Sequence, residues 1–432
     1  MKQLVFFLVA FICLAGYAAG EEKSNSILTL DASIRISLAI NSDIQIARQI
    51  LGGAEERKGK DLSGLLPVLS TGYSYTLLND TKSIYNVTLT PKETYAFTTT
   101  LRQPLFAGFK LLKQYQIAGL QVDISRFELE RIRQDVIFKT KELYFSVLQA
   151  ERLFRVAEDS VTKLADHEKV AKNFYDVGIT PKNDLLEAEV ELANARQEQV
   201  AAENRLNEAR AEFNTLLRRN IDTPVVLEDV LTHSSFNSTF QFCWEAAQKN
   251  RAELKVTALQ ISIANKEVEL AKGGYLPSLD LIGNYEKTGD NLALQEGTSI
   301  EDPNSWNVTI AATWPLFEGG KTQHDVREKI SILIQAREEA KKAEDDILLQ
   351  VKKAHLRVKE AEKNILTVQK AIEQAQENLR MNEERYKEQV STSTDVLDAR
   401  TLYSKTCVNY YNALCAYNIE KARLYHAMGV ER

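Results

Sequence analysis

Apolar residues recur every three or four positions over two long stretches of the chain. No glycine or proline interrupts the stretch between Gly119 and Gly178, or the one between Gly320 and Gly429. The spacing is that of a heptad repeat, which is typical of left-handed coiled coils. The first stretch predicts a helix from about Gly108 to Tyr175, on the order of 100 Å long at 1.5 Å per residue. Its apolar positions include Ile132, Val136, Leu143, Val147 and Leu164, and those of the second include Val351, Val358, Ile365, Ile372 and Leu379.

Each long stretch is followed by a short turn and a second helical stretch. Residues 183–218 and 394–428 carry the same apolar spacing back along the chain. The turns that precede them, at 175–184 and 386–395, are too short for anything but an antiparallel return. The sequence therefore predicts two long antiparallel helical hairpins with coiled-coil packing.

Four shorter segments alternate apolar and polar residues with period two. This alternation is typical of β-strands that have one apolar and one polar face. The residues between the members of each pair, 78–92 and 287–304, are rich in Asn, Asp, Gly, Thr and Pro and are predicted as loops. The four segments are 68–77, 95–101, 279–285 and 306–314.

The two halves of the chain match each other. At an offset of 210 residues, Leu66-Pro67 corresponds to Leu276-Pro277. At an offset of 211, Pro104-Leu105-Phe106 corresponds to Pro315-Leu316-Phe317, and Tyr175 corresponds to Tyr386. An internal repeat of this kind indicates two copies of one structural unit.

Each half predicts the same order of elements: a short amphipathic helix, two strands and a long helical hairpin. The amphipathic helices are expected at about 30–58 and 240–272. The predicted division of the chain is a signal peptide at 1–20, a first repeat at 21–223, a linker at 224–237 and a second repeat at 238–432.

The first residues have the features of a secretory signal peptide. Lys2 precedes the apolar run Leu4–Leu14, and small residues follow up to Gly20. This pattern predicts export, with cleavage near Gly20; a buried N-terminal helix is the alternative. No segment of the sequence is long and apolar enough to span a bilayer as a helix, which takes about 20 residues.

Composition and charge exclude several classes of protein. The 432 residues are 26% charged and 44% hydrophobic, which is ordinary for a water-soluble chain. The formal net charge of −6 becomes −7 without residues 1–20, so nothing electrostatic favours nucleic acid as a partner. The remaining cysteines, Cys243, Cys407 and Cys415, are odd in number and are interpreted as small apolar packing residues.

No motif for catalysis, cofactor binding or metal binding is recognisable. The glycines do not have the spacing of a phosphate-binding loop, and no serine lies in a nucleophile elbow. The histidines are scattered and are each expected on a solvated helix face or in a loop. We therefore predict no enzyme, no cofactor and no metal site. The histidines are His167, His233, His324, His355 and His426.

The strands raise the question of what covers their apolar faces. A strand pair with an apolar face and no partner sheet is not stable alone, and closing a barrel takes about eight strands. Backbone groups in a membrane must all be paired, so an exported chain could close a barrel only by pooling strands from several copies. Aromatic residues near strand ends, Tyr75, Tyr285, Trp306 and Trp314, suit a membrane interface. A soluble sheet that caps the helices is the alternative.

With these features in this order, essentially the whole mature chain resembles the outer membrane efflux protein (TolC) family. The supporting motifs are the Leu-Pro strand entries, the Pro-Leu-Phe-x-Gly exits at 104–108 and 315–319, and the two tip turns. The stretch Asp395-Val396-Leu397-Asp398 is similar to the family's second tip motif. Each motif alone is weak evidence for the family. Because all of them occur in order and at a constant repeat offset, together they are a specific signal for it.

The resemblance implies a mainly α fold with a small β part. It implies a homotrimer in which four strands per chain form a twelve-stranded barrel in outer membrane lipid and the helices form a tunnel across the periplasm. Segments 30–58 and 240–272 would form a belt around the middle of that tunnel. The implied function is a passive exit duct of a tripartite efflux or type I secretion system, with a periplasmic adaptor (membrane fusion) protein and an inner-membrane transporter as partners at the helix tips.

The resemblance also implies a periplasmic entrance or gate formed by five residues, Asp395, Asp398, Asp184, Tyr175 and Tyr386. A threefold axis would multiply Asp395 and Asp398 into rings of carboxylate that favour cations. The other three residues would help to hold the tip closed. A simpler interpretation is that the aspartates only cap the first turn of the return helices.

Two positions depart from the family pattern. Gln389 occupies the site that corresponds to Gly178, and Ser391 stands where some relatives carry an arginine that locks the entrance. The resemblance therefore leaves the details of closing open. A periplasmic structural coiled-coil protein without a pore is the alternative function, and a secreted enzyme is a weaker third.

Overall fold

The computed structural model describes residues 27–80, 82–84, 87–90, 92–294 and 304–431. The predicted signal peptide at 1–20 and part of the predicted loops at 78–92 and 287–304 lie outside the described residues.

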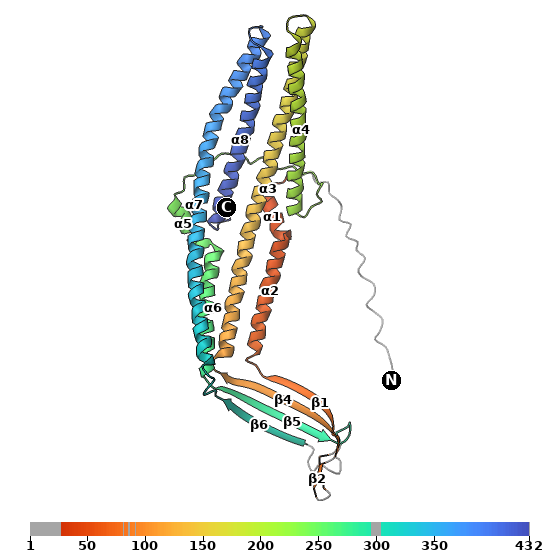
Figure 1. The fold of residues 1–432 in the computed structure, drawn as a ribbon, viewed down its shortest axis with the longest axis vertical. Helices are drawn as coiled ribbons and strands as arrows, with labels where there is room; N and C mark the ends of the chain where they lie inside the picture. Colours follow the sequence, from red (N-terminus) through yellow and green to blue (C-terminus); the bar gives the residue numbers. More distant parts are fainter. Residues whose placement is uncertain (1–26, 81, 85–86, 91, 295–303, 432) are drawn as a thin grey trace, which may run out of the picture.

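The described part of the molecule is elongated, with a sheet at one end and helical tips at the other (Figure 1). Two helices of 67 residues each, α3 (Lys110–Asp176) and α7 (Lys321–Lys387), run from the sheet to the tips. At the tips they turn into α4 (Lys182–Leu216) and α8 (Ser393–Ala427), which return to mid-height (Figure 1). The two predicted hairpins are confirmed.

The amphipathic segments each form two helices instead of the single helix that we predicted. The breaks fall at Asn41 and Arg251. Asn41 caps the new helix with its side chain, which accepts from the backbone nitrogen of Asp43 at 2.8 Å, whereas Arg251 makes no side-chain cap bond. The four helices are α1 (Leu30–Ile40), α2 (Ser42–Ser63), α5 (Phe240–Asn250) and α6 (Ala252–Lys272). Helices α1 and α5 lie at mid-height, while α2 and α6 continue to the sheet (Figure 1). The belt around the tunnel stays a prediction.

The main sheet is antiparallel and has the strand order β1-β4-β5-β6. Strand β4 is longer than the predicted segment 95–101 and crosses an irregularity between Pro104 and Phe106. The strands are β1 (Val68–Leu77), β4 (Glu93–Ala107), β5 (Ser278–Gly289) and β6 (Asn304–Thr313).

Part of the segment predicted as a loop at 78–92 is a small hairpin. Strands β2 (Lys82–Ile84) and β3 (Val87–Thr90) pair with each other and not with the main sheet. The loop prediction was wrong here because it weighed the polar residues over the Val and Thr residues, which favour strands.

Each strand of the main sheet continues into a helix of one wall. Helix α2 leads into β1 and α6 into β5, while β4 leads into α3 and β6 into α7. The helices contact each other in the corresponding order, α2 with α3, α3 with α6, and α6 with α7. The sheet and the helical wall are therefore one continuous surface with the same order of elements.

The elements of the second half follow those of the first at a constant distance along the chain. Helix α5 begins 210 residues after α1, and α7 begins 211 residues after α3. The boundaries of the two repeats and of the linker at 224–237 stay predictions. Residues of that linker pack inward, since the Tyr144 hydroxyl donates to the backbone oxygens of Leu28 and Glu228 at 3.0 and 2.8 Å.

Apolar side chains along the heptad seams form the core. One cluster joins α7 and α8 through residues such as Val351, Ile365 and Tyr417, and another joins α3 and α4 around Tyr144 and Phe213. The cysteines Cys243, Cys407 and Cys415 are buried and free, as predicted. No helix in the described ranges has the length and apolar character needed to cross a bilayer.

The expectation that every histidine is solvated is wrong for two of them. His167 and His355 are each only 8% exposed. His355 lies at 6.3 Å from the ring of Phe236 and 6.1 Å from that of Phe240, and its Nε2 is 3.1 Å from the backbone oxygen of Ser238. Both residues occupy seam positions that face a second element, so their environment depends on helix packing.

Candidate functional site

The five candidate residues all lie at or next to the two tip turns, at the end of the molecule that is remote from the sheet (Figure 1). Tyr175 and Tyr386 end the long helices α3 and α7. Asp184 lies in the first turn of α4, and Asp395 and Asp398 lie in the first two turns of α8.

The two tip turns have the same backbone conformation. Gly178 and Gln389 both adopt the left-handed region, with φ of 77° and 61°. The Gly178 backbone nitrogen donates to the Tyr175 oxygen at 2.9 Å, and the Gln389 nitrogen donates to the Tyr386 oxygen at 3.0 Å. Helices commonly end on such a residue, and it is usually glycine. Gln389 therefore replaces glycine without changing the turn, at a cost in backbone strain.

Asp395 caps the start of α8. Its carboxylate accepts from the Thr392 backbone nitrogen and from the Ser391 hydroxyl, both at 2.9 Å, and its own nitrogen donates to the Thr392 hydroxyl at 3.2 Å. The Thr392 hydroxyl also donates to this carboxylate, at 2.8 Å. The bond from the Thr392 backbone, and then those from the Thr392 and Ser391 hydroxyls, lower the pKa of Asp395 below its usual range. Asp395 is therefore part of the helix cap, to which Ser391 contributes. The interpretation that both aspartates only cap the helix stays a prediction.

Asp398 lies three residues beyond Asp395 on α8, so the two carboxylates share one side of the helix. Both side chains are exposed. Asp184, in contrast, is only partly exposed. Two exposed carboxylates with the same orientation make this face of the tip negative.

The two tyrosines that correspond in the repeat have opposite environments. Tyr386 is 5% exposed, whereas Tyr175 is 37% exposed. The Tyr386 ring packs between the hairpins, at 5.3 Å from the ring of His167 and 5.6 Å from that of Phe174. Burial raises the pKa of the Tyr386 phenol, and the charge of Asp184 adds to the effect.

His167 joins the two hairpins and was not among the predicted site residues. Its Nε2 lies 2.9 Å from the Ser393 hydroxyl oxygen at the start of α8. Burial, and then the positive charge of Arg400, lower the pKa of His167 to about 4. Arg400 is itself buried and pairs with Glu383. The signal in the sequence was the spacing, because His167 follows the seam residue Leu164 by three positions.

Two further contacts connect the hairpins near the tips. The Thr394 hydroxyl of α8 donates to the Glu187 carboxylate of α4 at 2.9 Å. Below it, Leu164, Leu192 and Leu397 from three helices form a small buried cluster. The two hairpins of one chain are therefore packed against each other near the tip.

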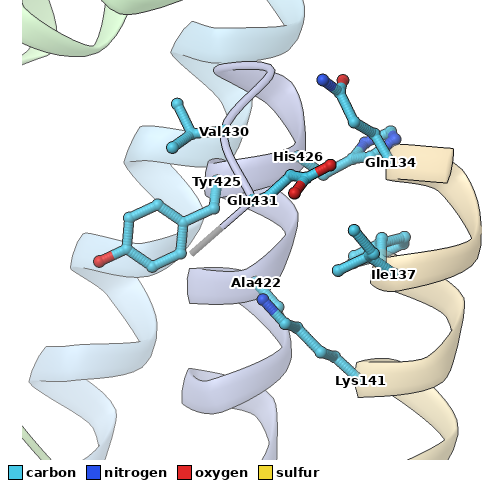
Figure 2. A pocket seen from close by; sticks show the side chains of 9 residues that line it. Gln134, Ile137, Lys141, Ala422, Tyr425, His426, Val430 and Glu431 are labelled. Carbon is cyan, nitrogen blue, oxygen red and sulfur yellow. The ribbon is translucent and has the colours of Figure 1, made fainter. Parts of the chain in front are cut away.

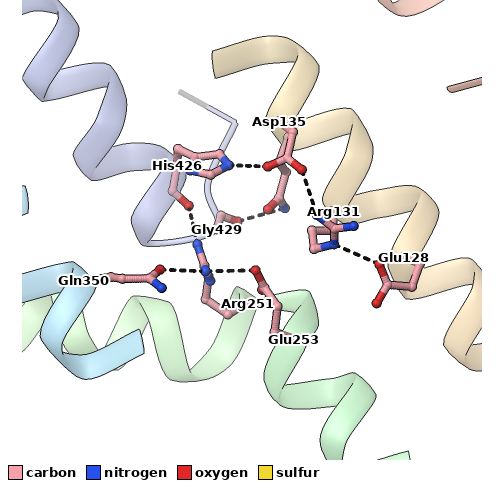
Figure 3. Close-up of polar contacts among 9 residues, drawn as sticks. Glu128, Arg131, Asp135, Arg251, Glu253, Gln350, His426 and Gly429 are labelled. Carbon is pink, nitrogen blue, oxygen red and sulfur yellow. Dashed lines mark hydrogen bonds and ion pairs between the residues drawn. The ribbon is translucent and has the colours of Figure 1, made fainter. Parts of the chain in front are cut away.

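A second polar cluster ties the same helices together at mid-height (Figure 3). His426 of α8 lies 2.7 Å from the Asp135 carboxylate of α3. Arg251, which is 6% exposed, donates to the His426 backbone oxygen at 3.2 Å and to the Gln350 side chain of α7 at 3.1 Å, and pairs with Glu253 at 2.8 Å. These contacts fix the base of the hairpins against the wall formed by α3, α6 and α7.

Beside this cluster is a small pocket between α3 and the end of α8 (Figure 2). Lys141, Gln134 and Glu431 are among its lining residues. Its cavity volume is about 10 Å³, enough for about one water molecule. This pocket is too small for a substrate.

Comparison with known families identifies the chain. The model of the outer membrane efflux protein family matches residues 34–217 and 244–430. The chain belongs to the outer membrane efflux protein family. The two matched segments each contain one long hairpin and one strand pair of the main sheet, which agrees with the repeat seen in the sequence.

Individual members of the family are similar over most of their length. The chain is 25% identical to the outer membrane efflux protein BepC of Brucella suis over 326 residues, which is 73% of this chain and 69% of BepC. It is 22% identical to the outer membrane protein TolC of Escherichia coli over 439 residues, covering 99% of this chain and 87% of TolC. The solved structure of the Campylobacter jejuni CmeC outer membrane channel matches with a TM-score of 0.77 at 17% identity, over 99% of this chain and 94% of CmeC.

Membership of the outer membrane efflux protein family gives the protein its location and its function. It is an exit duct of the outer membrane that serves efflux or secretion, and its helical part lies in the periplasm. The predicted fold class and function are thus confirmed, and a periplasmic coiled-coil protein without a pore is not supported. The family is one of transport proteins; the prediction that the chain has no enzymatic activity stays a prediction.

Proposed function

We propose that three copies of the chain form the duct. The observation that carries this proposal is the sheet with two open edges, β1 and β6. Inside a membrane every backbone group must be paired, so these edges must close on other strands. Four strands per chain are below the minimum of about eight for a barrel, and three copies give twelve.

The exposed side chains of the edge strands support closure in lipid. Leu69 of β1 is 67% exposed, and Trp306 and Ile310 of β6 are 76% and 65% exposed. Apolar side chains exposed along an edge strand invite pairing with another chain. In a trimer this band of side chains meets lipid on the outside of the barrel.

Native mass spectrometry of the protein purified in a mild detergent tests the assembly. The expected main species has three times the mass of one chain. A monomer or dimer as the largest species would contradict the trimer. Blue native electrophoresis of membrane extracts serves as the control that detergent has not dissociated the assembly.

We also propose that the packed tips close the periplasmic end of the duct at rest and that opening separates the hairpins. The buried ring of Tyr386 supports this, because it fills the space between α3 and α7 at the tip. The periplasmic adaptor protein and the inner-membrane transporter are proposed to bind here. Exposed apolar residues at the turns, Val177 at 68% and Val390 at 63%, suit such contacts.

Replacing Tyr386 tests the closed tip. Tyr386→Ala removes the ring that fills the space between the hairpins, so we expect a several-fold rise in resting single-channel conductance in planar bilayers. Tyr175→Ala is the matched control, because Tyr175 is the exposed counterpart in the other repeat. Equal conductance of the Tyr386→Ala variant and the wild type would remove this residue from the closure.

On the trimer, Asp395 and Asp398 are proposed to form carboxylate rings at the entrance. Their exposure and their common orientation on α8 support this role. The capping of α8 by Asp395 does not compete with it, because a capping carboxylate remains ionised and its pKa is lowered.

A further inference from the structure

The part of the helical wall next to the sheet contains a basic groove that the function of a duct does not use. We propose that this groove, formed by α2, α3 and α6, binds a phosphate group, which is carried either by a lipid headgroup or by a soluble compound. Helix α3 packs against both α2 and α6 where the three helices approach the sheet (Figure 1). Each chain would carry one such site.

The groove has the size and the charge of an anion site. Its cavity volume is about 490 Å³, and ligand sites in proteins commonly measure about 300–1,000 Å³. Three basic side chains and one acidic side chain are among its lining residues, which gives it an excess of positive charge. A concave surface of one sign attracts ligands of the opposite sign. The charged lining residues are Lys58, Arg126, Lys266 and Asp123.

Lys58 of α2 supplies a charge that no carboxylate of the chain occupies. Its Nζ lies 5.5 Å from the centre of the Tyr115 ring of α3. Within the part of the chain that the structure describes, no carboxylate lies at ion-pair distance from it. A lysine ammonium has three N–H donors and no acceptor, so Lys58 can donate to an anion in the groove.

The other two cations do not use all of their capacity either. Lys266 lies 3.4 Å from the Glu269 carboxylate, which also pairs with Lys113. Two lysines thus share one carboxylate, and positive charge is left over at the edge of the groove. The Arg126 guanidinium lies 3.0 Å from the Asp123 carboxylate, and it has further N–H donors beyond the one used there.

The floor of the groove is open because α3 has a glycine there. Glycine is unfavourable inside a helix compared with alanine. A Cβ added to Gly119 would lie 3.9 Å from Nζ of Lys58 and 3.8 Å from its Cε, which is ordinary contact. The backbone at this position therefore does not require glycine. What Gly119 provides is space beneath the Lys58 ammonium.

Gln116 adds a second polar group to the lining of the groove. Its side-chain oxygen is buried and has no hydrogen-bond partner among the residues that the structure describes. Buried polar atoms are normally paired, so an unpaired one calls for an explanation. An amide that turns over presents its NH₂ group at the same place, and Gln116 can then donate to a phosphate oxygen.

The groove lies on the outside of the duct. Gln116 and Asp123 precede Tyr144 by 28 and 21 residues, and residues at multiples of seven share one face of a coiled-coil helix. The Tyr144 hydroxyl donates to the backbone oxygens of Leu28 and Glu228, so this face of α3 carries the segment before α1 and the linker. Connections on the inner face would obstruct the duct.

This position is accessible to both sources of phosphate. Lys58 and Lys266 precede the ends of α2 and α6, at Ser63 and Lys272, by five and six residues, which is about 8–9 Å of helix. Those ends lead towards β1 and β5, and the headgroup layer of a bilayer is about 5–7 Å thick. Long lysine side chains can extend towards such a layer. Soluble phosphate compounds reach the same groove from the periplasm.

Native mass spectrometry with added phosphatidylglycerol tests the lipid source. The lipid should stay bound to the purified protein, and Lys58→Gln with Lys266→Gln should reduce the bound fraction at least fivefold. Lys60→Gln with Lys272→Gln is the matched control, because it removes two exposed lysines from the same helices outside the groove. The control should bind as the wild type does.

Titration calorimetry with sodium phosphate, against sodium chloride at equal ionic strength, tests the soluble source. Binding heat that Lys58→Gln with Lys266→Gln loses and the control keeps would assign the groove to soluble phosphate. Gly119→Leu tests the position for either source. It fills the floor of the groove with a better helix former, so circular dichroism should show intact helices while binding is lost.

Two results would overturn the proposal. If the wild type binds neither phosphatidylglycerol nor phosphate, the groove is not a phosphate site. If the wild type binds and the double lysine variant or Gly119→Leu binds equally well, the phosphate is held elsewhere. Neither result affects the proposed trimer or the closed tip, because these depend on the strands and on the hairpin ends.

Discussion

At the scale of single residues, the tip depends on a buried histidine that must stay neutral. His167 lies against Tyr386 of α7 and Ser393 of α8, with the Arg400 guanidinium nearby. A proton on this ring would place a second positive charge beside Arg400 in a buried site, which is unfavourable. The contact between the hairpins therefore weakens in acid.

The pH dependence follows from the pKa of His167, which is about 4 in the folded chain against an ordinary value of 6.5. Above pH 6.5 the ring is neutral in both the folded and the unfolded chain. As pH falls from 6.5 towards 4, the unfolded chain gains a proton that the folded chain does not, so the free energy of unfolding falls by up to about 3 kcal/mol.

Thermal unfolding between pH 7.5 and 4 measures this effect. The wild type should lose more of its Tm over this range than His167→Gln, which keeps a neutral hydrogen-bonding side chain. Parallel Tm curves for the two proteins would show that His167 does not carry the pH dependence.

At the scale of elements, the two hairpins are built alike but end differently. Both turns require a left-handed residue, and only one has glycine there, with Gly178 at φ 77° and Gln389 at φ 61°. A side chain in this region costs about 1 kcal/mol or more. The second tip therefore carries strain that the first does not.

Exchanging these residues should change stability in opposite directions. Gly178→Ala should lower the free energy of unfolding by about 1 kcal/mol, because it introduces the same strain into the first turn. Gln389→Gly should raise it by up to about 1 kcal/mol. Denaturant unfolding monitored by circular dichroism measures both. The same sign for the two variants would contradict the strain argument.

At the scale of the whole molecule, the proposed negative entrance would become effective only after assembly. One chain contributes Asp395 and Asp398, and a threefold axis would bring their copies close together. Rings of fixed carboxylate concentrate cations and repel anions at a pore entrance.

Neutralising this ring should change ion selectivity. Asp395→Asn with Asp398→Asn should raise anion conductance or weaken block by cations in planar bilayers, because the field at the entrance is lost. The matched control is Asp345→Asn with Asp346→Asn, which removes as many carboxylates from the middle of α7. If the tip variant responds to ions as the wild type does, these aspartates do not line the entrance.

The sequence by itself determined the plan of the molecule. The heptad spacing defined both hairpins, the period-two alternation located the four strands of the main sheet, and the offsets of 210 and 211 residues revealed the repeat. These features are visible because each depends on which residues follow one another along one element. Such a pattern can be recognised in the sequence without information on what the element packs against.

Only the tertiary structure decided what happens where elements meet. Tyr175 and Tyr386 are equivalent in the repeat, yet one is exposed and the other is buried against His167 and Phe174. The burial of His167 was likewise not predicted from its own neighbours in the sequence. The reason is that α8 packs against α3 and α4 of the first hairpin as well as against α7, whereas the main contacts of its counterpart α4 are with α3, which makes the two repeats unequal at the tip. Local pattern specifies each hairpin, and the contact between the hairpins specifies the site.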